Sequence, residues 1–110
     1  MKLDNFAAGA IDWSEFPSST LMGESGTATT RVRELGNVQL RLVDYSRKYV
    51  ADRWCRKGHI MFVVSGQVVI EHKDGPKFTL RAGMTYHVAD EPGSPHRITS
   101  KSGASLLILD

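Results

Sequence analysis

Turn-forming residues interrupt this 110-residue chain every several positions from residue 27 onward, and no window carries a helical apolar stripe. The segments between the turns are short, and several alternate apolar with polar residues. Eight or so short strands spaced in this way are typical of a β-sandwich or a small β-barrel, so we expect an all-β fold. The expected strands cover residues 27–35, 38–45, 49–55, 59–64, 67–71, 78–80, 84–88, 96–99 and 104–109.

The segment 38–45 shows how faces are assigned from alternation. Gly36-Asn37 before it is a hairpin turn signal. Val38, Leu40 and Leu42 are expected to face a core, whereas Gln39 and Arg41 are expected to face water.

The chain is predicted to be one domain, residues 1–110, with an irregular N-terminal arm over residues 1–26 and a barrel over residues 27–110. A chain of this length has room for a single core. Trp13 and Phe16 are costly to leave in water, so the arm is expected to lie against the domain or a partner subunit.

Charge and composition exclude several classes of protein. Fourteen basic and twelve acidic residues give a net charge of +2, without a basic stripe, so no nucleic-acid surface is expected. The longest apolar run, residues 60–64, is far short of a membrane span. A single cysteine forms no internal disulfide, which favours a reducing, cytoplasmic location.

The stretch 51–66 holds the first candidate site. Cys55 precedes His59 by four residues, and Arg53 precedes Cys55 by two. In an extended strand, these three side chains would share a face. Thiolate and imidazole are ligands for zinc and similar metals. The alternative for each residue alone is structural: a small buried apolar cysteine and a satisfied core histidine.

The spacing of these residues resembles the two-motif layout of the cupin superfamily. Cys55-x3-His59-x6-Gly66 is followed, further along, by His96 directly after a proline. The first cupin motif has two histidines, a glutamate and a glycine, and the second motif ends near a histidine. Arg53 and Cys55 stand where the two histidines of the first motif would be. His59 stands in place of the glutamate, and His96 in place of the final histidine.

More narrowly, the chain is similar to small cupin-fold proteins named for an Asp-His-Cys-Trp motif, with Arg53 where that motif has histidine. The likeness covers nearly the whole chain and implies a cupin-like jelly-roll β-barrel with an irregular N-terminal arm. It implies little about a reaction. Residues 51–59 carry the strongest likeness, and the supporting pieces are Asp12-Trp13, residues 23–28, residues 41–45, Val88-Ala89-Asp90, His96-Arg97 and Asp110.

The resemblance implies a metal site made of Cys55, His59 and His96. Such a set leaves a position open for water or substrate, which suits a catalytic ion. Zinc is the first choice, and iron and copper are the alternatives. Arg53 has no lone pair to give, and at roughly 5 Å its charge would repel the ion by about 3 kcal/mol.

The competing interpretation is a metal-free barrel that binds a small anion. Arg53 would hold the anion, because its guanidinium matches a carboxylate or phosphate, and Tyr86 would present a hydroxyl into the barrel. Alternatively, Arg53 swings outward to Asp90, Glu91 or another carboxylate. A third possibility is a role without any ligand.

Two further histidines and the assembly complete the sequence predictions. His72 is expected to be exposed at a turn, and His87 to point outward. No hydrolase, phosphate-loop or dinucleotide motif appears, so neither a reaction nor a named small-molecule substrate is predicted. We expect a homodimer formed through the arm or an edge strand.

Overall fold

The computed structural model describes residues 2–90 and 95–110, and this part of the chain confirms the all-β prediction. The described residues form nine strands and a single short 3₁₀ turn, with no α-helix among them. None of them forms a helix that is long and apolar enough to span a membrane. The elements are η1 (Trp13–Glu15), β1 (Ser19–Met22), β2 (Thr27–Leu35), β3 (Val38–Tyr45), β4 (Tyr49–Val50), β5 (His59–His72), β6 (Lys77–Arg81), β7 (Thr85–Val88), β8 (His96–Ser100) and β9 (Ala104–Leu109).

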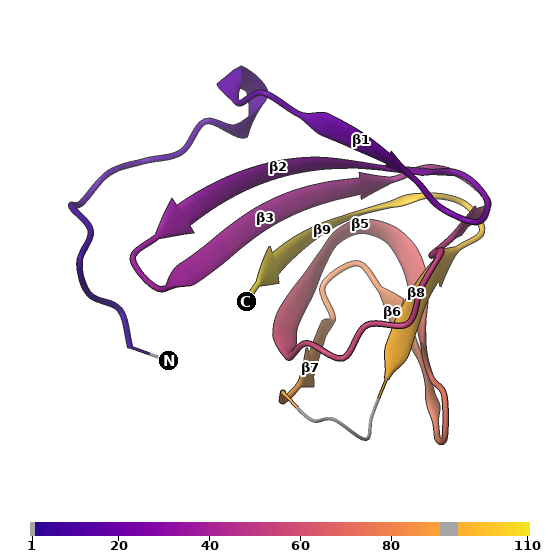
Figure 1. Ribbon diagram of the computed structural model, residues 1–110. Coiled ribbons are helices and arrows are strands. Elements are labelled where there is room, and N and C mark those ends of the chain that lie inside the picture. The colour runs from indigo at the N-terminus through magenta and orange to yellow at the C-terminus, as the bar shows by residue number, and fades with distance from the viewer. Residues whose placement is uncertain (1, 91–94) are drawn as a thin grey trace.

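The strands form one strongly curved sheet. They follow the order β1-β2-β3-β9-β5-β8-β4, and β6 and β7 also pair with β5. Figure 1 shows β2, β3 and β9 arching over one side, while β5, β6 and β8 curl beneath them. The inner faces enclose one core. Its buried members include Val43, Val63, Val68, Ile70, Leu106 and Ile108.

Strand β5 bends through the region where the sequence predicted a break. His59–His72 is one continuous strand, with a register shift between Val63 and Ser65. Gly66, at φ +79°, makes the last pair with β9, and Gln67 makes the first pair with β6. The prediction of two strands was therefore wrong. A β-bulge and a left-handed glycine let one strand serve both parts of the sheet.

The bulge changes which residues of β5 face the core. Before it, Met61 and Val63 are buried and their even-numbered neighbours are exposed. After it, the even-numbered Val68 and Ile70 are buried. One extra residue in a strand reverses every later side chain. This reversal also decides where His72 points.

Strand β3 also faces the core with residues other than those expected. The hairpin at Gly36-Asn37 is confirmed by the Leu35–Val38 pair. Val43 and Tyr45 are buried, however, and Arg41 lies on their face of the strand. Val38 is buried as expected, but Leu40 and Leu42 are partly exposed on the other face, so their assignment was wrong. Both faces of this strand carry apolar residues, and its register against the buried residues of β9 settles the choice.

The N-terminal segment is less irregular than predicted near its end. Residues 2–18 are irregular apart from η1, where the Trp13 and Phe16 rings pack at 5.4 Å. Residues 19–22 then form β1, which pairs antiparallel with β2. The β-branched Thr20 and Thr29 face each other across this pair, as suits a sheet edge.

Candidate metal site

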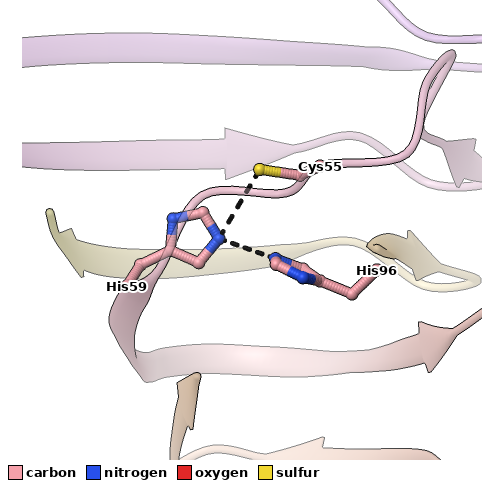
Figure 2. Close-up of side chains that lie close together, drawn as sticks. All are labelled: Cys55, His59 and His96. Carbon is pink, nitrogen blue, oxygen red and sulfur yellow. Dashed lines mark hydrogen bonds between the residues drawn. The ribbon is translucent and has the colours of Figure 1, made fainter. Parts of the chain in front are cut away.

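Cys55, His59 and His96 come together from three separate segments. Cys55 lies after β4, His59 begins β5 and His96 begins β8. An isolated bridge joins Cys55 to His96: the Cys55 amide donates to the His96 carbonyl at 2.7 Å, and the reverse bond measures 2.9 Å. Directly opposed residues share a face, so this bridge puts thiol and imidazole side by side. Figure 2 shows the three side chains pointing toward one another.

The ligand atoms of the three residues lie close to the spacing that a metal ion requires. Cys55 Sγ is 3.9 Å from His59 Nε2, which is 2.8 Å from His96 Nε2. All three ligand atoms lie within 4.8 Å of one another. Bond lengths to zinc imply separations of about 3.3 to 3.6 Å between tetrahedral ligands, so the two pairs that include His59 need shifts of about half an ångström and the Cys55–His96 pair has to close by about 1 Å. The donor set therefore fits a metal ion.

Both histidines are buried, at 6% exposure for His59 and 2% for His96. Burial is the main cause that lowers the pKa of His59; the Asp110 carboxylate opposes the shift, and Arg41 and Lys57 add to it. A neutral imidazole has a lone pair for a metal ion, which an imidazolium lacks.

Asp110 lies behind His59, and its contact with His59 was not predicted. Its Oδ2 is 3.3 Å from His59 Nδ1 and 3.0 Å from Arg41 Nη2, and its side chain is 2% exposed. The sequence marked Asp110 as part of the family likeness and placed Arg41 in water. Because 51 and 69 residues separate Asp110 from these partners, no local spacing signals the cluster.

His72 is a partly buried residue at the end of β5 beside the site, so the prediction of an exposed turn residue was wrong. Its Nε2 is 2.7 Å from the Tyr86 hydroxyl, and its ring lies 5.6 Å from that of His96, its partner in the β5–β8 register. The β5 bulge turns His72 inward. Tyr86 is buried with its ring 6.0 Å from that of His96, whereas His87 is exposed as expected.

Arg53 points away from the three ligand candidates. Its side chain is 87% exposed, and Nε lies 3.9 Å from Asp52 Oδ2. Within residues 51–58, only Cys55 forms a β-bridge. The strand predicted over residues 49–55 therefore ends at Val50. Of the carboxylates predicted for Arg53, Asp90 instead accepts a hydrogen bond from the Gly58 amide. Glu91 lies outside the described residues.

A cavity of about 400 Å³ lies between β1, β2, β3 and the segment after β4. Arg41, Arg53, Tyr45 and Tyr49 are among the residues that line it. Arg41 connects this cavity to the metal candidates through Asp110 and His59. The lining thus combines two arginines and two tyrosines with Asp52 and several apolar residues.

The three tyrosines are expected to resist ionisation in the folded protein. Burial raises the pKa of Tyr86 to about 12 and raises the pKa values of Tyr45 and Tyr49. The unfolded chain loses phenol protons near pH 10. The free energy of unfolding should therefore hold below about pH 10 and fall as pH rises toward 12. Near-ultraviolet absorbance checks this. Coincident phenolate curves for the folded and the urea-unfolded protein would contradict it.

Comparisons with known proteins place the fold. The sequence matches no family model. It matches no curated protein either. Among solved structures, a predicted oxalate decarboxylase from Thermotoga maritima superposes with a TM-score of 0.76, at 12% identity over 92% of this chain and 96% of that chain.

Two proteins from Shewanella frigidimarina are also similar. An RmlC-like cupin has a TM-score of 0.69 and 17% identity, over 96% of this chain and 88% of that one. A cupin-2 domain protein has a TM-score of 0.61 and 24% identity, over 74% of this chain and 78% of that one. These likenesses show the fold alone. The chain has the cupin-type jelly-roll fold of these neighbours.

Proposed function

We propose that this protein is a small metal-binding cupin, close to the Asp-His-Cys-Trp group, in which Cys55, His59 and His96 hold one divalent ion. The observation that carries the proposal is the convergence of their ligand atoms within 4.8 Å. The outward direction of Arg53 adds support, because it removes the charge repulsion inferred from the sequence.

The donor set favours a catalytic type of site. Three protein ligands leave one tetrahedral position for water or a small-molecule substrate. One thiolate and two imidazoles suit zinc first, and iron or copper next. When bound, such an ion supplies Lewis acidity or an activated water. The protein's own residues orient the ligands and exclude bulk water from the buried histidines.

Elemental analysis tests this proposal directly. Protein purified without chelator is expected to carry about one transition-metal ion per chain. Cobalt(II) substitution should give a thiolate-to-metal charge-transfer band that Cys55→Ser abolishes. His87→Gln, which changes an exposed histidine on the outer side of β7, should leave both results unchanged. Absence of metal from the wild type, together with no cobalt band, would reject the proposal.

A second candidate is the binding of a small anion without metal, and the cavity favours it. Both Arg41 and Arg53 line the cavity, and Arg41 Nε has no hydrogen-bond partner among residues 2–90 and 95–110. Guanidinium groups bind carboxylate and phosphate well. Tyr86, whose ring lies 6.0 Å from that of His96, is the other residue that the sequence predicted to contact the anion.

Thermal-shift measurements with inorganic phosphate and small carboxylates test the second candidate. Any anion that stabilises the wild type should fail to stabilise Arg53→Ala, while Arg81→Ala, which removes another exposed arginine, should respond normally. An unchanged response of Arg53→Ala would reject the role of Arg53. If Arg53→His binds zinc more tightly than the wild type, the wild-type protein has a degraded metal site, and the anion-binding candidate gains support.

We also propose a homodimer formed through the edge strand. Strand β1 ends the sheet, with Leu21 at 64% and Met22 at 71% exposure. An uncovered apolar edge favours pairing with a second copy. Light scattering at micromolar concentration is expected to show a dimer, and Leu21→Ser with Met22→Ser is expected to weaken it. A monodisperse wild-type monomer would contradict this.

A further inference from the structure

We propose that Asp110 is a positioning residue that keeps the proton of neutral His59 on Nδ1, and that Arg41 holds Asp110 in this role. The proposal rests on the proposed metal site, because it explains how His59 presents Nε2 to the ion. Neither residue touches the ion or a substrate in this role.

The backbone of Asp110 is fixed by the sheet. Its carbonyl accepts from the Gln39 amide at 2.6 Å, and its own amide donates to the Gln39 carbonyl at 2.9 Å. These bonds extend the pairing of β9 with β3 by one residue. The Asp110 side chain is 2% exposed, so it has little freedom to turn away from His59.

The proton on His59 follows from the chemistry of its neighbour. An ionised carboxylate only accepts hydrogen bonds, so at 3.3 Å from Asp110 Oδ2 the Nδ1 atom must be the donor. A neutral imidazole that carries its proton on Nδ1 has its lone pair on Nε2. Nε2 is also the atom that faces Cys55 Sγ and His96 Nε2. With its proton on Nδ1, His59 accepts at Nε2, and His96 Nε2 is then the donor across the 2.8 Å contact in the metal-free protein.

Arg41 makes the buried carboxylate tolerable. A carboxylate removed from water is costly unless a cation and hydrogen bonds compensate for it. Arg41 Nη2 donates to Asp110 Oδ2 at 3.0 Å, and Lys57 Nζ lies 4.0 Å from Oδ1. Arg41 belongs to the inner face of β3, which puts its guanidinium beside the end of β9.

Zinc affinity, measured by competition with a chromophoric chelator, tests the role of Asp110. Loss of a residue that orients a ligating histidine lowers metal affinity by about 10- to 100-fold. Asp110→Ala is expected to show this loss. Asp110→Asn, which keeps an acceptor oxygen, should recover much of it. Asp44→Asn is the matched control, because Asp44 pairs with Arg31 on the outer face of β3.

Nuclear magnetic resonance of the metal-free protein gives a readout that a merely structural role would not move. Long-range proton–nitrogen correlations should show His59 of the wild type protonated on Nδ1, and Asp110→Ala should shift the population toward Nε2. A wild-type ring protonated on Nε2 would overturn the proposal, even if the variant fails to fold. The proposal would also be overturned if Asp110→Ala bound zinc as tightly as the wild type and kept the same His59 tautomer. If the wild type binds no zinc, only the proposed function fails, because the tautomer is measured without metal.

Discussion

Zinc at about 1,000 times its dissociation constant is expected to raise the free energy of unfolding of the wild type by about 4 kcal/mol. The reason is linkage: an ion that binds only the folded arrangement stabilises it by RT times the logarithm of one plus the ratio of the free ion concentration to the dissociation constant. Cys55 and His96 lie 41 residues apart in the chain and meet through a bridge between the segment that precedes β5 and the first residue of β8. Unfolding would separate them, so the unfolded chain has no preformed site.

Urea unfolding with and without zinc measures this gain. Cys55→Ser should lose most of it, because a neutral hydroxyl is a poor replacement for a thiolate. His87→Gln should keep it in full, since His87 lies on the outer side of β7. A zinc effect of equal size in wild type and Cys55→Ser would show that the ion binds elsewhere.

Gly66→Ala is expected to destabilise the fold by about 4 kcal/mol or more, a loss found when backbone strain and overlap combine. Gly66 has φ +79°, and a methyl group there would overlap the Gly103 carbonyl oxygen and lie 2.7 Å from Ala104 Cα. Both neighbours are backbone atoms of the turn into β9, so neither can move without breaking the β5–β9 pairing.

Gly83→Ala separates the two causes. Gly83 has φ +92°, and nothing lies within 4 Å of a methyl group placed there. The Gly83→Ala variant should therefore lose only the backbone-strain contribution, about 1 to 3 kcal/mol of the free energy of unfolding. Chemical unfolding followed by circular dichroism measures both variants. Equal losses would show that close approach at Gly66 does not matter.

The sequence determined the features that depend on neighbours along the chain. Alternation and turn residues predicted the all-β class, and Gly36-Asn37 predicted the β2–β3 hairpin, because both signals are local. The candidates Cys55, His59 and His96 came from spacing and resemblance. The structure brings their ligand atoms together, although their role as ligands stays a prediction.

Tertiary structure decided the features that depend on register between distant strands. The β5 bulge turned His72 inward, and pairing with β9 turned Arg41 toward Asp110. The path after β4 sent Arg53 into solvent. A strand's alternation looks the same before and after a shift of one residue, so only its partners show which face is buried. For that reason the ligand candidates were visible in the sequence, while their contacts with Asp110, Arg41 and His72 were not.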